Sequence, residues 1–169
     1  MPSFQTQRRV NHSAAKMFDL VADMESYPQF VPMCAGLRIR SRTRNAEGLD
    51  VITAAMDVGY RAIRETFTSK VTLDRANMRI AVDFLDGPFK QGGNRWAFLD
   101  LAQERGEASR VDFSITYEFS SRVLALLMGS MFDAAFRRFA QAFEERANVV
   151  YGRNGAGKAP YSGREGKAA

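Results

Sequence analysis

The longest regular pattern of hydrophobic and polar positions lies in residues 122–151. In the second half of this segment, apolar side chains recur at helical spacing, with charged and amide side chains between them. The apolar positions are Phe132, Ala135, Phe136, Phe139, Ala140, Phe143, Ala147 and Val150. This half is predicted to be an amphipathic helix with one face toward a core. At about 1.5 Å per residue the whole helix spans roughly 40 Å, which is the width of a domain.

The first half of the same helix is apolar on all sides. Val123, Leu126 and Leu127 fall on the face that carries polar residues further along the helix. One interpretation is that loops cover these three side chains. The other is that they form an exposed surface that meets a membrane or a protein partner.

The preceding 120 residues alternate between short apolar segments and turn-forming residues. A helix is predicted with Ser13 as its N-cap and an end near Asp23, followed by one more turn over Glu25–Phe30. The predicted strands are Ser3–Val10, a segment after Cys34 that runs to Arg44, Leu49–Tyr60, Ala62–Leu73, Met78–Leu85, Asn94–Gln103 and Arg110–Phe119. Between Trp96/Phe98 and Ala97/Leu99, the pattern leaves open which pair faces inward, because both are apolar.

In the strand after Cys34, four arginines alternate with other residues. Arg38, Arg40, Arg42 and Arg44 are therefore expected to share one face. They protect the edge of a sheet in one interpretation, and contact lipid headgroups or RNA phosphates in the other.

The order of elements is one strand, two short helices, six strands and one long helix. Short turns between successive strands imply an antiparallel meander. We predict an α+β fold in which a curved antiparallel sheet of about seven strands surrounds the C-terminal helix and leaves a ligand cavity between them. Residues 1–151 form one domain, and residues 152–169, which are rich in Gly, Ala and charge, are predicted to be disordered.

Composition narrows the classes of function. The chain has 169 residues, 46% of them hydrophobic, and a formal charge of +5. Four cations and one carboxylate after Tyr151 contribute +3 of that charge, so the remaining +2 argues only weakly for nucleic-acid binding. No apolar run reaches the ~20 residues of a membrane span. With no visible signal or transit peptide, a bacterial cytoplasmic protein is expected, with peripheral contact to the inner membrane as an option.

Candidate catalytic and metal-binding residues are few. One cysteine, Cys34, and one histidine, His12, exclude an internal disulfide and a zinc site rich in these residues. Phosphate-binding glycine motifs, a metalloprotease helix and a nucleophile elbow are missing from the sequence. Glu65 shares a strand face with Ile63 and Phe67, and we interpret it as part of an ion pair, or as a ligand-orienting group, rather than as a general base.

A long apolar cavity is predicted between sheet and helix, and a core with no void beyond a few waters would contradict a carrier function. The predicted ligand-binding residues are Tyr27, Phe30, Met56, Phe67, Phe84, Phe89, Trp96, Phe98, Phe113, Tyr117, Phe132 and Phe136. Trp96 and Tyr27 join apolar area to a hydrogen-bond donor, which suits an aromatic ligand that carries polar groups. We expect both to matter more for binding than for folding.

Several segments in this order resemble the START-like or helix-grip superfamily, and within it the coenzyme Q-binding protein family. They are Tyr27–Cys34, Arg64–Val71, Asp86–Lys90, Arg95–Phe98, Met131–Phe139 and Glu144–Ala147. The resemblance covers roughly residues 3–151. It implies non-catalytic binding of ubiquinone or a similar isoprenoid lipid in the cavity, in support of respiration, with no metal.

Two other functions stay open within the same superfamily. A ribosome-associated toxin of similar sequence implies a regulator that binds the ribosome, and aromatic polyketide cyclases imply an enzyme with a polar, acid-lined cavity. The sequence leaves ligand length and oligomeric state undetermined.

Overall fold

Seven strands and two α-helices make up the described part of the chain. A computed structural model describes residues 1–102 and 107–152. In chain order the elements are β1 (Ser3–Val10), α1 (Ala14–Ala22), the 3₁₀ helix η1 (Met24–Gln29), β2 (Cys34–Arg44), β3 (Asp50–Tyr60), β4 (Ile63–Asp74), β5 (Arg79–Phe84), β6 (Phe89–Asp100), β7 (Ser109–Phe119) and α2 (Arg122–Tyr151). The predicted tail beyond residue 152 and the end of the predicted strand at Gln103 lie outside the described residues.

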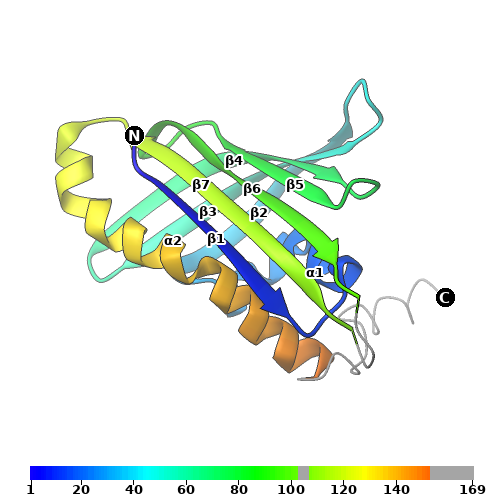
Figure 1. Cartoon of the computed structure of the whole chain (residues 1–169). Coiled ribbons are helices and arrows are strands. Elements are labelled where there is room, and N and C mark those ends of the chain that lie inside the picture. Colours follow the sequence, from blue (N-terminus) through cyan, green and yellow to red (C-terminus); the bar gives the residue numbers. More distant parts are fainter. Residues whose placement is uncertain (103–106, 153–169) are drawn as a thin grey trace.

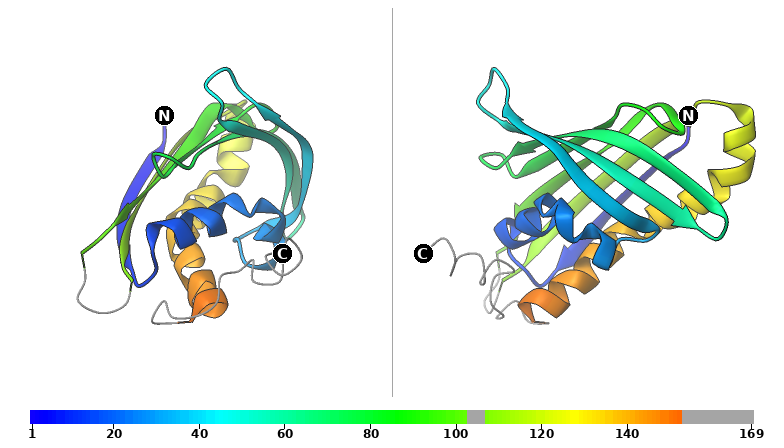
Figure 2. Two further views of the ribbon diagram at one scale, coloured as in Figure 1. Left: turned by 90° about the vertical axis from the view of Figure 1, so that its right-hand side faces the viewer. Right: turned by 180° about the vertical axis from the view of Figure 1, so that it is seen from behind.

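The strands form one antiparallel sheet in the order β1-β7-β6-β5-β4-β3-β2. Strands β2 to β7 follow one another as a meander, whereas β1 pairs with β7 and leaves β2 at the opposite edge. The sheet curls around α2, which runs along its inner face, and α1 with η1 crosses from one edge to the other (Figures 1 and 2). The predicted α+β fold with a curved sheet around the C-terminal helix is confirmed.

The helix α2 has the bounds that its pattern predicts. The Ser121 side chain caps it by accepting a hydrogen bond from the Leu124 amide at 3.1 Å. Its buried face consists of Met128, Phe132, Ala135, Phe136, Ala140, Phe143, Ala147 and Tyr151. Val123, Leu126 and Leu127 are exposed to 64%, 86% and 65%, so no described loop covers them.

The first helix and the turn after it also follow their sequence signals. Ser13 accepts a hydrogen bond from the Lys16 amide at 3.1 Å, as an N-cap does, and the Asp100 carboxylate accepts one from the Ala14 amide at 2.8 Å. The predicted extra turn is the 3₁₀ helix η1, which contains Pro28. These contacts fix α1 to the end of β6.

Strand β6 begins five residues earlier than predicted, at Phe89 instead of Asn94. The pair Gly92 and Gly93 gave no strand signal, but both glycines lie within the sheet. Gly92 has a φ of +143°, and a Cβ at Gly93 would stand 2.1 Å from the carbonyl oxygen of Val82 on β5. The glycines therefore allow an unusually close approach of neighbouring strands.

The exposure of the β6 side chains settles whether Trp96/Phe98 or Ala97/Leu99 faces inward. Trp96 and Phe98 are 4% exposed, whereas Leu99 is 51% exposed. The four inward positions of β7, which are Val111, Phe113, Ile115 and Tyr117, are all buried as well.

The prediction that four arginines share one face of β2 is wrong. Ile39 lies opposite Ala54, but Arg42, three residues later, lies opposite Ile52, only two residues away on β3. This irregularity reverses the alternation, so Arg38 and Arg42 point to opposite faces. Arg38 pairs with Asp57 at 2.6 Å on one face, and Arg42 reaches Glu25 of η1 at 3.4 Å on the other.

Candidate ligand cavity

A narrow hollow lies between the inner face of the sheet and α2. It encloses about 590 Å³ of space, its opening included, but only about 60 Å³ is wide enough for a water molecule. At ~30 Å³ per water in the liquid, that is room for about two waters. The prediction of a long cavity is therefore wrong in size, because methionine and phenylalanine side chains line the space closely. By the criterion stated above, this closed form contradicts a carrier with a preformed cavity.

Half of the predicted ligand-binding residues line this hollow. Its wall consists of Met24, Tyr27, Leu37, Ala54, Met56, Phe67, Ser69, Val71, Val82, Phe84, Asn94, Trp96, Phe136, Phe139 and Phe143. The other predicted residues, which are Phe30, Phe89, Phe98, Phe113, Tyr117 and Phe132, do not line it. Those that belong to strands also face inward, but they lie further along their strands than the hollow extends. Alternation shows which face a residue occupies, but not how far it lies from the hollow.

Some of these other aromatic residues form a cluster between the hollow and the first turns of α2. Phe89 stacks on Phe84 at a centroid distance of 4.7 Å and on Phe119 at 5.6 Å, and it meets Phe132 at 5.3 Å. Phe84 and Phe67 belong to the wall of the hollow. The side chains that lie between the hollow and the start of α2 are thus mainly aromatic.

Trp96 belongs to the core as much as to the cavity wall. Its ring lies 4.5 Å from Phe113 and 5.0 Å from Phe143. Tyr27 donates its hydroxyl to the carbonyl oxygen of Val21, and burial raises the pKa of its phenol well above the usual value. Both residues therefore have structural contacts as well, and the expectation that they matter more for binding than for folding stays a prediction.

Asn94 is a polar residue among the wall residues that were not predicted as ligand-binding. Its side chain is 7% exposed, and its Oδ1 has no hydrogen-bond partner. An unsatisfied buried acceptor costs roughly 1–3 kcal/mol of folding free energy. Ser69, which is 8% exposed, is a second polar residue of the wall. A polar residue at an inward strand position, two before Trp96, was the available signal.

The candidate catalytic groups lie away from reactive surroundings. Glu65 lies opposite the buried Val58 and so faces inward, but within the described residues it forms no ion pair, contrary to our interpretation. Cys34 is buried, and burial raises the pKa of its thiol to about 11. The described residues contain no group of three or more His, Cys, Asp or Glu side chains that could hold a metal ion.

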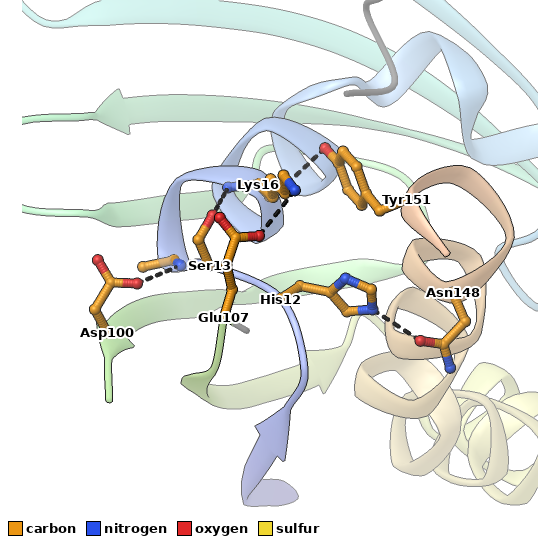
Figure 3. A network of polar contacts seen from close by, with 8 residues as sticks. His12, Ser13, Lys16, Asp100, Glu107, Asn148 and Tyr151 are labelled. Carbon is orange, nitrogen blue, oxygen red and sulfur yellow. Dashed lines mark hydrogen bonds and ion pairs between the residues drawn. The ribbon is translucent and has the colours of Figure 1, made fainter. Parts of the chain in front are cut away.

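His12 takes part in a polar network at the far end of α2 (Figure 3). Its Nε2 lies 2.8 Å from Oδ1 of Asn148, and the Tyr151 hydroxyl donates to the carbonyl oxygen of Lys16 at 2.9 Å. Lys16 also forms an ion pair with Glu107 at 2.8 Å. The network ties the C-terminal end of α2 to α1 and to the residues just before β7.

A larger hollow, in which about 780 Å³ is wide enough for a water molecule, lies on the outer face of the sheet. Most residues of its lining occupy the strand positions between the inward-facing ones, and they include Gln7, Arg79, Arg95 and Asp112. Because it is broad and open, it encloses no ligand. The smaller interior hollow is the better candidate site, since ligand sites bury most of the ligand.

Residues 10–144 match the model of the family described as polyketide cyclase / dehydrase and lipid transport, and the chain belongs to this family. The ribosome association toxin RatA of Escherichia coli K12 is 38% identical over 151 residues, which cover 89% of this chain and 90% of that protein. The mitochondrial coenzyme Q-binding protein COQ10 homolog B of Xenopus laevis is 26% identical over 150 residues, which cover 89% of this chain and 59% of that protein.

Solved structures share the fold. An 18 kDa protein of Caulobacter crescentus is 30% identical, with a TM-score of 0.68 over 90% of this chain and 99% of that chain. A START superfamily protein of Mycobacterium smegmatis has a TM-score of 0.70 at 20% identity, with 88% and 98% covered. The second likeness supports the START-like fold alone. In the described part of the chain, no helix is both long and apolar enough to cross a bilayer.

Proposed function

We propose that the protein binds an isoprenoid quinone or a similar lipid, without catalysing a reaction, in the hollow between sheet and α2. The observation that carries the proposal is the wall itself, which is apolar and aromatic apart from Asn94, Ser69 and the engaged Tyr27 hydroxyl. Such a wall suits an apolar molecule with a small polar head. Membership in a lipid transport family and the similarity to a coenzyme Q-binding protein support the same function.

Binding requires the hollow to widen. Met24 and Met56 belong to the wall, and methionine side chains change shape at low energetic cost. The ligand displaces these side chains and the few waters that fit, and it then occupies the space between Trp96 and Phe139. The protein binds its ligand by induced opening rather than in a preformed tunnel.

Mass spectrometry of an organic extract tests this function. Protein purified from a quinone-producing bacterium should release about one isoprenoid quinone per chain. Met56→Trp, which fills the hollow, should lose it, whereas Thr68→Trp on the outer face of β4 should retain it. Extracts of folded wild-type protein that contain neither quinone nor another lipid would contradict the proposal.

We also propose that the protein docks on anionic membranes through the end of the fold where α2 begins. Because the sheet is antiparallel, the start of β1 and the ends of β3, β5 and β7 lie at this end of the fold. The exposed apolar residues beside these strand ends and in the first turns of α2 are Met1, Tyr60, Leu85, Val123, Leu126 and Leu127. The β5–β6 connection is joined to the start of α2 by a hydrogen bond from the Ser120 amide to the Pro88 carbonyl. Among the described residues, Arg61 in the β3–β4 turn and Arg122 at the start of α2 form no ion pair with a carboxylate, so they are available to lipid phosphates.

The ribosome is the second candidate partner. Relatives named for ribosome association are 38% identical over nine-tenths of the chain, which is a higher identity than that of the coenzyme Q-binding relative. Cosedimentation with ribosomes on a sucrose gradient tests this function independently of lipid content. A cyclase function is less favoured, because the residues that line the hollow include no carboxylate.

A further inference from the structure

The hollow is too small for the whole of a long-chain isoprenoid lipid. Even with its opening included, it encloses about 590 Å³. At ~30 Å³ per non-hydrogen atom, which is the share of one water in the liquid, this space holds about twenty such atoms. A ubiquinone ring with its substituents takes more than half of them, and the space that is left accommodates one or two prenyl units. The rest of a long chain must therefore leave the hollow.

Two ways out of the hollow are closed by packing that includes polar contacts. Toward α1, the ring of Phe98 meets Phe18 at 5.8 Å, and the Asp100 carboxylate accepts a hydrogen bond from the first amide of α1 at 2.8 Å (Figure 3). Toward η1, Arg146 of α2 donates to the side-chain oxygen of Gln29 at 2.9 Å. A chain that passed on either side would separate hydrogen-bonded groups, which costs free energy.

The way toward the start of α2 is closed by aromatic rings, and Phe89 is the centre of this closure. Its ring centroid lies 5.3 Å from Phe67 and 4.7 Å from Phe84, which both line the hollow. On its other side it lies 5.6 Å from Phe119 and 5.3 Å from Phe132. Phenylalanine rings carry no hydrogen-bonding groups, so they move apart without leaving a polar atom unpaired. This is therefore the least costly way out for an apolar chain.

We infer that the chain of the ligand leaves the hollow past Phe89, and that this residue sets how many prenyl units the fold encloses. The inference rests on the proposed function and specifies which part of the ligand is held inside. The ring and the first one or two prenyl units lie between the sheet and α2. The remaining chain extends toward the exposed apolar side chains at the start of α2, so its length contributes little to the affinity.

Trp96 provides the measurement, because it is the sole tryptophan of the chain and belongs to the wall. Fluorescence titration compares ubiquinone analogues that carry no, one, two, three or four prenyl units. Each enclosed unit should lower Kd roughly tenfold or more, because its apolar surface leaves water. Units beyond the second should change Kd by less than about threefold, because they stay largely outside the fold.

Two truncations on the same strand locate the way out. Phe89 and Phe98 are each 4% exposed, and they lie on β6 on opposite sides of Asn94 and Trp96, which line the hollow. Phe89→Ala frees more volume than one prenyl unit occupies, so the third unit should now lower Kd roughly tenfold. Phe98→Ala frees the same volume on the other side and should keep the wild-type dependence on chain length. If either variant does not fold, Phe89→Leu and Phe98→Leu replace the pair, with a smaller shift expected for Phe89→Leu.

The outcomes separate this inference from the proposed function. If Kd of the wild type keeps falling roughly tenfold with every unit up to the fourth, the fold encloses the whole chain and the inference fails. It also fails if truncation of Phe98 rather than of Phe89 makes the third unit favourable, or if neither truncation does. In each of these cases quinone binding itself stands. If none of the analogues binds to the folded wild-type protein, the proposed function fails instead.

Discussion

At the scale of single residues, the wall of the hollow and the hydrophobic core share the same side chains. Trp96 contacts Phe98, Phe113 and Phe143, and it also faces the hollow. A substitution there removes core packing and ligand contact together. Binding and folding are therefore separable only at wall positions that make few core contacts.

Trp96→Ala should lower the free energy of unfolding by ~3–5 kcal/mol, as truncation of a buried aromatic side chain does. Chemical denaturation measures the change, and Leu99→Ala on the same strand is the control. Leu99 is half exposed, so its truncation should change stability by less than about 0.5 kcal/mol. A modest loss for Trp96→Ala together with lost quinone binding would restore the original expectation that Trp96 mainly binds ligand.

Single residues also show what the sequence pattern could and could not predict. Alternation identified the inward face of most strands, and with it Met56, Phe67 and Phe84. It did not identify Asn94, because a single polar residue interrupts the apolar pattern, and it placed Phe98 too close to the ligand. The distance of a residue from the hollow depends on sheet register, which no single strand contains.

At the scale of elements, α2 is one continuous helix whose two halves differ in how much of their apolar surface is buried. Its second half buries Phe136, Ala140 and Phe143 against the sheet. Its first turns extend beyond that contact, at one end of the fold (Figure 1), and leave Leu126 and Leu127 in solvent. An exposed apolar surface of this kind is expected to meet another apolar phase.

Leu126→Ser combined with Leu127→Ser should weaken binding to anionic liposomes while the thermal midpoint stays nearly unchanged. Flotation of the protein with vesicles measures the binding. Val149→Ser is the matched control, because Val149 is 77% exposed at the opposite end of the same helix. Equal flotation of the folded double variant and wild type would reject docking at this surface, and loss of folding would show that the leucines are buried in an assembly.

Elements with their own sequence signals were predicted well. Ser13 and Ser121 cap the helices they precede, and α2 has its predicted bounds. The start of β6 was predicted wrongly because Gly92 and Gly93 resemble a turn, and the irregularity in β2 went unnoticed. Both errors concern contacts with a neighbouring strand, which local propensity does not encode.

At the scale of the whole molecule, the two ends of α2 are held differently. The C-terminal end is fixed by His12 to Asn148, by Tyr151 to the Lys16 carbonyl and, one turn earlier, by an Arg8–Glu144 ion pair at 2.6 Å. Aromatic packing at Phe132 anchors the other end, and in the first turns beyond it Met128 is buried whereas Val123, Leu126 and Leu127 are exposed. Movement of α2 away from the sheet is thus easier at the end that carries Leu126.

Hydrogen exchange should show this difference. Amides of residues 122–131 are expected to exchange faster than those of residues 140–151, because opening is easiest where few side chains are buried. Exchange mass spectrometry of full-length protein measures both segments, and a bound quinone should slow the first more than the second. Equal protection of the two segments would contradict opening of the hollow at this end.

The overall architecture was predictable because seven strands, short turns and one long helix allow few arrangements. The free volume of the hollow was not predictable from the sequence. It is a small difference between two large volumes, the space inside the curved sheet and the side chains that fill it.

Gly93 has a consequence for how this fold can diverge. A side chain at this position would stand 2.1 Å from the Val82 carbonyl, so any replacement must push β5 and β6 apart. Its neighbour Asn94 is buried as well, but it borders the free space of the hollow. A single nucleotide change can therefore alter the chemistry at position 94 while the adjacent backbone holds its place. Descendants of this chain can acquire new ligands one residue at a time and inherit the frame unchanged.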